Sequence, residues 1–188
     1  RDRSPSRGLG DVYKRQVVKG TSDADLNKGP GHYTDSQMPG AKGNFAMAGH
    51  RVGRGAPFND LGLLKTCDAV VVETAGSWNI YRILPIDVPE NEREQAASEC
   101  MSPDLSHQMA SGPYASIQGR HITVPSDVSV INPIPGQMET KVAQDDASLL
   151  TMTTCHPQYS NAERMIVHAV LVKKEPKRPG YLPKELQE

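Results

Sequence analysis

Short runs of β-branched and aromatic residues, separated by turn-forming residues, are the feature that most limits the folds open to this chain of 188 residues. The clearest pair is Ala69–Thr74 and Trp78–Leu84, with Ala75-Gly76-Ser77 as the turn of a predicted β-hairpin. No repeat of solenoid or propeller period is visible. Many short strands with little helix predict an all-β fold, and we expect a closed or nearly closed barrel.

The remaining predicted strands are Asn44–Ala48, His121–Pro125, Val128–Ile131, Leu149–Cys155 and Arg164–Val172. Two segments favour helix instead. Ser22–Pro30 has the pattern of a short capped helix that is ended by Gly-Pro. Residues 89–112 are rich in helix formers, and Ser102-Pro103 is typical of an N-cap followed by proline at the first helical position. We therefore expect one or two short helices inserted between strands.

The length of the chain favours one domain with a substantial core. Residues 1–16 have little apolar content and no periodicity, which predicts a disordered or non-native leader. We assign the folded β-barrel domain to residues 17–175. Residues 176–188 are expected to form a polar C-terminal tail.

Charge argues against a nucleic-acid partner, and hydropathy argues against a membrane-spanning helix in this sequence. The 21 basic and 22 acidic residues nearly balance, and no basic block with interleaved aromatic residues is present. Nucleic acid is therefore not an expected partner. The longest apolar runs, such as Ala69–Val72, are much shorter than the roughly 20 residues of a membrane-spanning helix. We expect the chain as given to be soluble.

The three cysteines form an odd set. If the protein works outside the cytoplasm, two can be bridged and one left as a free reactive thiol. Cys67 and Cys100 are the natural pair, because neither has the chemical context of Cys155. A bridge across their separation of 33 residues would stabilise the fold by about 3.5–4 kcal/mol on chain-entropy grounds. The alternative is two unconnected buried thiols, since free cysteine is commonly buried.

Cys155 ends one predicted strand, and Arg164 begins the next strand nine positions later. Adjacent strands could hold the thiol and the guanidinium side by side. A nucleophilic cysteine needs nearby positive charge or a histidine partner. A fixed arginine could also hydrogen-bond a substrate carbonyl and stabilise the oxyanion that thiolate attack creates. The alternative for Arg164 is an ordinary surface charge at the start of a strand.

His50 has the strongest claim among the six histidines to be the partner of Cys155, because it closes an apolar strand where its ring can face a cleft. His156 is adjacent to Cys155, so on a continuing strand its side chain points to the opposite face. His168 lies inside an apolar strand and is expected to be a satisfied core histidine. The other three lie in loop, polar or edge contexts: His32, His107 and His121. Spacing alone does not establish that His50 meets Cys155.

Metal and phosphate sites are weakly supported. The sequence has no Cys-x-x-Cys or His-x-x-x-His cluster, which disfavours zinc. Gly53-Arg54-Gly55 is too short for a P-loop and lacks the Gly-Lys-Ser/Thr ending.

Four stretches together resemble the active-site segments of sortases: Gly43–Arg51, Gly55–Asn59, Leu150–Pro157 and Arg164. The resemblance extends from about Gly20 to Val172, and the fit is best to the class E group of actinobacteria. The combination of histidine, Thr-x-Thr-Thr-Cys and arginine in this order is highly specific. It implies a closed eight-stranded sortase β-barrel with short helices in its loops. Because residues 1–16 lack a strand pattern, we expect the first strand to be missing or poorly formed.

The resemblance also implies a function. Sortases cleave an LPXTG or LAXTG sorting signal between Thr and Gly, then pass the acyl group through a cysteine thioester to a cell-wall amine. Cys155 would be the nucleophile, His50 the general acid and base, and Arg164 the ligand of substrate and oxyanion. Thr154 would face the substrate groove and help to position the peptide, and Thr153 is assigned to the same groove.

The implied partners are surface proteins with a C-terminal sorting signal and a peptidoglycan precursor amine of the lipid II type. The implied location is the extracellular face of the plasma membrane of a Gram-positive actinobacterium. The N-terminal membrane anchor of sortases is absent from this sequence. No cofactor is implied, and no acidic loop cluster resembles the calcium site of some class A enzymes. We therefore predict metal independence.

Residues 89–112 lie where sortases place the loop between strands six and seven, which shapes the groove. We hypothesise that a Cys67–Cys100 bridge ties this insertion to the hairpin. Two other functions compete. A papain-like cysteine hydrolase is disfavoured, because such enzymes place the nucleophile at the start of a helix. A noncatalytic β-barrel binding module would not need the Cys155 thiol.

Overall fold

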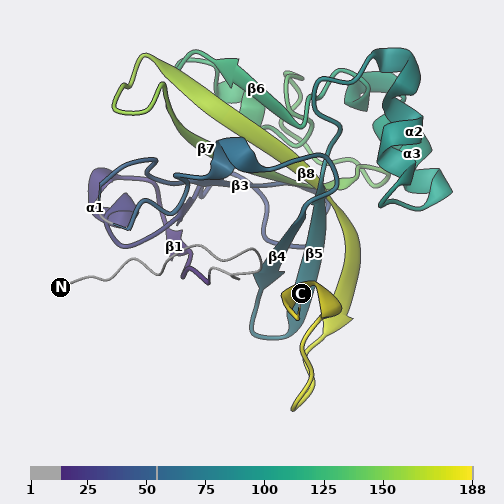
Figure 1. Cartoon of the computed structure of the whole chain (residues 1–188), viewed down its shortest axis with the longest axis horizontal. Helices are drawn as coiled ribbons and strands as arrows, with labels where there is room; N and C mark the ends of the chain where they lie inside the picture. The colour runs from purple at the N-terminus through teal and green to yellow at the C-terminus, as the bar shows by residue number, and fades with distance from the viewer. Residues whose placement is uncertain (1–13, 54, 188) are drawn as a thin grey trace.

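The computed structural model describes residues 14–53 and 55–187. Their strands wrap into one curled sheet (Figure 1). The strands of this part of the chain are β1 (Val18–Lys19), β2 (Gly31–His32), β3 (Gly43–Ala48), β4 (Ala69–Glu73), β5 (Ser77–Ile83), β6 (Arg120–Thr123), β7 (Ser148–His156) and β8 (Glu163–Pro176). Their order in the sheet is β1-β2-β3-β7-β8-β5-β4, and β6 pairs with β8. The predicted eight-stranded all-β fold is confirmed.

Short helices fill the connections between these strands. The described α-helices are α1 (Asp23–Leu26), α2 (Arg93–Ser98) and α3 (Pro103–Met109). The described 3-10 turns are η1 (Leu61–Leu63), η2 (Glu90–Glu92), η3 (Gly112–Tyr114), η4 (Val128–Ile131) and η5 (Lys184–Leu186). Ser22 caps α1 in a reciprocal capping box with Asp25, and Ser102 caps α3 ahead of Pro103. Both predicted helix starts are confirmed.

The two faces of the central strands have different roles. Side chains alternate along β7, so Leu150 and Met152 enter the main core while Thr151, Thr153 and Cys155 point the other way. The core cluster is completed by β3, β5 and β8, through residues such as Phe45, Met47, Tyr81, Ile83, Met165, Val167 and Ala169. The opposite face of β7 and β8 is therefore free to carry polar side chains.

The insertion between β5 and β6 covers one end of that opposite face. Leu149 of β7 and Val170 of β8 pack in a second apolar cluster with Ala97 and Met109 of the helices. Figure 1 shows α2 and α3 together at one side of the sheet. Arg93 of α2 is 1% exposed and donates to the carbonyl groups of Met109 and Ile117. Burial lowers the pKa of this guanidinium. Apolar packing and buried hydrogen bonds thus hold the insertion in place.

The disulfide hypothesis is confirmed, since Cys67 and Cys100 are bridged and Cys155 is the free cysteine. Cys67 lies just before β4, and Cys100 follows α2. The bridge therefore ties the helical insertion to the β4–β5 hairpin.

One predicted strand is wrong, because Val128–Ile131 forms the 3-10 turn η4. The Asp127 carboxylate accepts hydrogen bonds from Thr123 Oγ1 at 2.8 Å and from Ser129 Oγ at 2.6 Å. These local bonds curl the chain and override the β propensity of its valines and isoleucine. Conversely, β8 is longer than predicted and continues to Pro176.

Two further expectations concern the leader and the C-terminal tail of the chain. Residues 1–13, most of the predicted leader, lie outside the described residues, and the first described strand is the two-residue β1. In the C-terminal segment, the Glu185 side chain is only 4% exposed and lies 3.2 Å from Lys173 Nζ and 3.6 Å from Arg82 Nη2. This segment folds back on the sheet through its charges.

His168 is the buried core histidine that the sequence predicts, at 1% exposure. The Asn44 amide donates to the carbonyls of Val130 and Asn132, so its oxygen accepts from Thr151 Oγ1 at 2.9 Å. Because that hydroxyl hydrogen is used, His168 Nδ1 must donate to Thr151 Oγ1, 2.8 Å away. Burial lowers the pKa of His168 to about 3, so the ring stays neutral.

We predict that removing the disulfide by Cys67→Ala/Cys100→Ala lowers the free energy of unfolding by about 3.5–4 kcal/mol, because the unfolded chain gains loop entropy. Chemical denaturation without reductant measures this difference. Adding reductant to both proteins should close the gap. A gap that persists in reductant would assign the loss to packing rather than to the bridge.

We also predict that stability falls as the pH drops from about 6.5 towards 3, since the unfolded state protonates His168 in this window while the folded state does not. Denaturation midpoints at a series of pH values measure the slope. His168→Asn keeps a donor for Thr151 but cannot titrate, so its slope should be shallower. An equal slope in both proteins would show that His168 does not contribute.

Candidate active site

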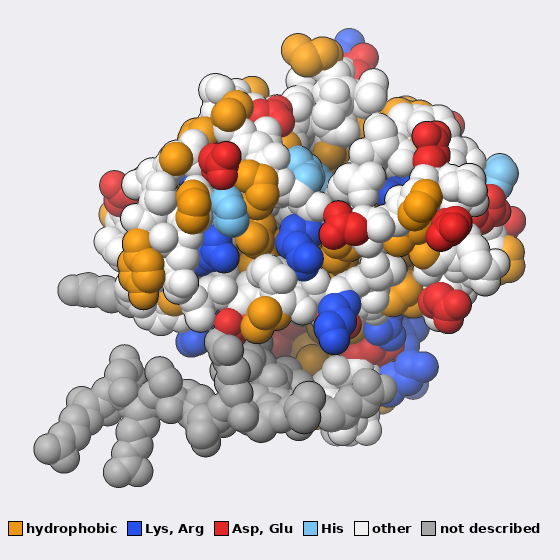
Figure 2. All heavy atoms as spheres, turned by 45° about the horizontal axis from the view of Figure 1, so that its top comes forward, with side chains coloured by type: hydrophobic (Ala, Val, Ile, Leu, Met, Phe, Trp, Pro, Cys, Tyr) orange, Lys and Arg blue, Asp and Glu red, His pale blue; other side chains and the backbone are white. Residues whose placement is uncertain are grey.

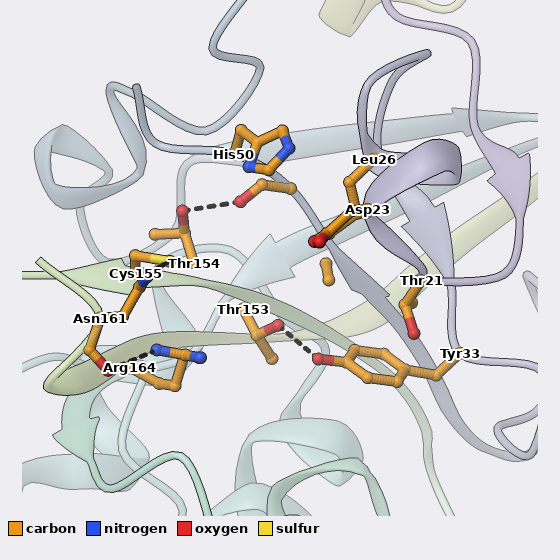
Figure 3. Close-up of a pocket in the computed structure, with 12 residues that line it drawn as sticks. Thr21, Asp23, Leu26, Tyr33, His50, Thr153, Thr154, Cys155, Asn161 and Arg164 are labelled. Carbon is orange, nitrogen blue, oxygen red and sulfur yellow. Dashed lines mark hydrogen bonds between the residues drawn. The ribbon is translucent and has the colours of Figure 1, made fainter. Parts of the chain in front are cut away.

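The pairing of three strands brings the predicted site residues to one end of the sheet. Cys155 on β7 is the direct partner of Arg164 on β8. The parallel pairing of β3 with β7 aligns Ala48 with Thr153, so His50 follows its strand at the end that carries Cys155. Figure 3 shows the thiol, the imidazole ring and the guanidinium around one pocket. The structure therefore brings together the three side chains that the sequence singled out.

The pocket has a volume of about 380 Å³. One wall comes from the α1 region, through Thr21, Asp23 and Leu26. The facing wall comes from the ends of β3 and β7 and from the loop that follows Cys155 (Figure 3). A cavity of this volume is large enough to hold a small ligand, with a thiol, an imidazole ring and a guanidinium at its edge.

His50 is held by contacts on both sides of the chain. Gly49 N donates to Thr153 O at 3.1 Å, and Thr154 Oγ1 donates to Gly49 O at 2.8 Å. On the other side, Phe58 N donates to His50 O at 3.1 Å. A Cβ atom at position 49 would lie 2.6 Å from the Phe58 ring, so only glycine permits this approach. The main chain at His50 is thereby fixed beside β7.

The thiol and the guanidinium both contact a residue that sequence reasoning missed, Asn161. Cys155 Sγ donates to Asn161 Oδ1 at 3.0 Å. Arg164 Nη1 donates to the main-chain oxygens of Asn161, at 3.2 Å, and Glu163, at 3.0 Å. In this resting arrangement Asn161 therefore contacts both groups. Its position in the short loop that joins the two site strands is the signal that could have identified it.

Thr153 and Thr154 both line the pocket, but each hydroxyl already has a partner. Thr154 is 3% exposed and uses its hydroxyl to hold Gly49, as described above. Thr153 Oγ1 lies 2.9 Å from the hydroxyl of Tyr33, a second pocket residue that sequence reasoning missed. Tyr33 lies in a turn-rich loop that has no motif of its own. Thr154 in this structure thus positions the chain before His50.

His156 is directed away from the thiol, as the alternation of side chains on a strand predicts. Its ring contacts Arg51 and lies 3.9 Å from a carboxylate oxygen of Glu163. His32 and His107 also have partners outside the pocket, in the Gln37 carbonyl and the Glu94 carboxylate.

Charge, metal-ligand geometry and hydropathy give three further facts. Figure 2 shows acidic and basic side chains interspersed over the face that it presents. Among residues 14–53 and 55–187, no group of three His, Cys, Asp or Glu side chains is arranged to hold a metal ion. In the same part of the chain, no helix combines the length and apolar character needed to cross a bilayer.

Comparison with known proteins identifies relatives over most of the chain. The sortase domain family matches residues 8–172. The SrtF sortase of Corynebacterium diphtheriae is 51% identical, with a TM-score of 0.88 over 92% of this chain and 84% of that one. Sortase E of Streptomyces avermitilis is 34% identical, with a TM-score of 0.60 over 90% of this chain and 85% of that one.

Two curated relatives come from Streptomyces coelicolor. Sortase SrtE1 is 31% identical over 80% of this chain, and sortase SrtE2 is 29% identical over 91%. The chain spans only 34% and 54% of the lengths of these two proteins. A crystal structure of the S. coelicolor sortase E1, 28% identical to this chain, holds a tripeptide in its active site.

We predict that Asn161→Ala accelerates the alkylation of Cys155 by iodoacetamide about 2- to 10-fold at neutral pH. The reason is that the Asn161 oxygen accepts from the protonated thiol, and a net hydrogen bond of this kind contributes about 0.5–1.5 kcal/mol. Mass spectrometry of quenched samples measures the rate. Gln158→Ala in the same loop is the control, and it should leave the rate unchanged. A slower rate in Asn161→Ala would show that Asn161 supports the thiolate instead.

Proposed function

This chain belongs to the sortase family of cysteine transpeptidases, with class E members among its relatives, and on that premise we propose that it cleaves a sorting signal of the LAXTG or LPXTG kind between Thr and Gly. The acyl group is then transferred to a cell-wall amine. One observation carries this proposal, the direct pairing of Cys155 with Arg164 at the edge of a pocket that His50 also lines.

In the proposed reaction, Cys155 Sγ attacks the carbonyl carbon of the threonine in the signal, and its proton passes to His50. Arg164 donates hydrogen bonds to the oxygen that becomes negatively charged, and it exchanges its main-chain partners for this oxygen. His50 then protonates the glycine nitrogen as the peptide bond breaks. The product is a thioester on Cys155 and a free amine-terminated fragment.

The second half of the proposed reaction reverses these proton movements. An incoming amine attacks the thioester carbonyl, and His50 takes the proton that the amine releases. The sulfur leaves as the new amide bond forms, and the thiol recovers its proton. The chemistry thus needs one nucleophile, one proton carrier and one cation, with no metal or cofactor.

The shape of the pocket supports a peptide substrate. Leu26, Ala48 and Tyr33 supply apolar surface for the apolar residues that begin the signal. The tripeptide in the active site of the S. coelicolor enzyme is consistent with a groove of this size in the family. Thr153 and Thr154 form the β7 side of the groove and place it directly beside the thiol.

The proposed partners follow from the family. Sortases are cell-surface enzymes, and we assign this one to the extracellular face of the plasma membrane. Its protein substrates would be surface proteins with a C-terminal sorting signal. The acceptor amine would belong to a peptidoglycan precursor of the lipid II type. The Cys67–Cys100 bridge supports this location, because disulfides persist in oxidising compartments.

We predict that incubation with an LAXTG or LPXTG peptide and an amine, either glycine or a diaminopimelate-like compound, yields a transpeptidation product that mass spectrometry detects. Cys155→Ala should abolish the product, and Arg164→Ala should reduce turnover about 10²- to 10³-fold, the usual effect of losing an oxyanion donor. His50→Ala should also prevent turnover, since the leaving amine is not protonated.

Other outcomes separate the competing functions. Hydrolysis without transfer at any amine concentration would identify a cysteine peptidase. Peptide binding without cleavage, unchanged in Cys155→Ala, would identify a binding module and overturn the proposed function. The ratio of turnover between the two signal peptides measures the preference at their second position.

A further inference from the structure

The ladder between β3 and β7 ends with an unusual donor at the Cys155 carbonyl. Main-chain donors on the β3 side recur at every second residue, with Gly43 N bonded to Ala147 O at 3.0 Å and Gly49 N bonded to Thr153 O at 3.1 Å. The next step of this parallel register would bring the amide of residue 51 to Cys155 O. There, Cys155 O accepts from the side chain of Arg51 instead, with Nη1 at 3.3 Å.

The register of β3 with β7 places His50 level with Cys155, and paired residues on neighbouring strands face the same side of a sheet. The regular ladder ends there, and the next residue keeps contact with β7 through its side chain. By using its side chain, Arg51 lets the backbone leave while the Cys155 carbonyl keeps a charge-assisted hydrogen bond. The residue next to the proposed base is thereby tied to the main chain of the proposed nucleophile.

The same arginine nitrogen has a second partner on the far side of β7. Arg51 Nη1 lies 2.9 Å from His156 Nδ1. Arginine only donates, so Nδ1 is the accepting nitrogen and the neutral ring carries its hydrogen on Nε2. That nitrogen lies 3.9 Å from Glu163 Oε2 on β8. Arg51, His156 and Glu163 therefore form a connected set behind Cys155, on the face away from the pocket.

We propose that Arg51 is a positioning residue that sets the separation between Cys155 and His50 by clamping the Cys155 main chain and the His156 ring. This inference rests on the proposed function, in which the thiol and the ring exchange a proton. Arg51 does not line the pocket, so it acts through these neighbours and not on the peptide. A shift of about 1 Å between reacting groups can reduce a rate about 100-fold.

The chain offers a matched control for loop tethering. Gln158 Nε2 donates to Asn59 Oδ1 at 3.1 Å, which joins the same two loops through exposed side chains. Neither residue is among those that line the pocket, and Cys155 Sγ is hydrogen-bonded to Asn161. If simple tethering of the loops were the role of Arg51, loss of the Gln158 contact should have a comparable effect on turnover.

The test measures kcat and KM for the sorting-signal peptide in wild type, Arg51→Ala, Arg51→Lys and Gln158→Ala. Arg51→Ala should lower kcat about 10- to 100-fold and leave KM within about 2-fold, because the peptide groove is intact while the reacting groups are misplaced. The kcat of Arg51→Lys should lie between those of wild type and Arg51→Ala, since a single ammonium cannot reproduce the arginine fork. Gln158→Ala should stay within about 2-fold of wild type.

Several outcomes would overturn the inference. One is an unchanged kcat in Arg51→Ala, and another is a raised KM at unchanged kcat, which would place Arg51 in peptide binding. Equal losses in Arg51→Ala and Gln158→Ala would reduce its role to tethering. Thermal unfolding of each variant identifies a folding defect. If Arg51→Ala has one, the comparison of kcat between wild type and Arg51→Lys tests the inference instead. A wild type without turnover would instead refute the proposed function, and this inference with it.

Discussion

The parallel pairing of β3 with β7 is the interaction on which the rest of the structure depends. It aligns six residue pairs between segments about 100 positions apart, from Gly43 with Ser148 to Ala48 with Thr153. Side chains alternate along a strand, so a slip of one residue would turn the polar face of β7 into the core. The packing of Phe45, Leu150 and Met152 in one cluster opposes such a slip. Burial of the core therefore determines where the thiol points.

The opposite face of the same strands carries an ordered series of polar side chains. At one end Cys155 and Arg164 border the pocket. Farther along, Thr151 of β7 is paired with His168 of β8, and both are buried with fixed hydrogen-bond partners. Beyond them, Leu149 and Val170 are covered by the helical insertion. One face thus changes from reactive to structural over a few residues, because the insertion covers only part of it.

Local patterns in the sequence predicted most of the strands, both capped helices and the cysteine pair, because each depends on residues close in the chain or on simple elimination. The approach of His50 to the Cys155 strand came from family resemblance, since spacing gives no register between distant strands. Asn161, Tyr33 and Arg51 were missed because their roles depend on contacts with main-chain or side-chain atoms of other segments. Val128–Ile131 was misread because the Asp127 carboxylate overrides local propensity.

The bridge between Cys67 and Cys100 also has an analytical consequence. With those two sulfurs bridged, each folded molecule offers a single free thiol, and that thiol borders the pocket. An electrophile shaped like the peptide would therefore leave at most one adduct per molecule. The mass of the intact protein would then give the fraction of molecules that react, without a reporter group and without a substitution in the chain.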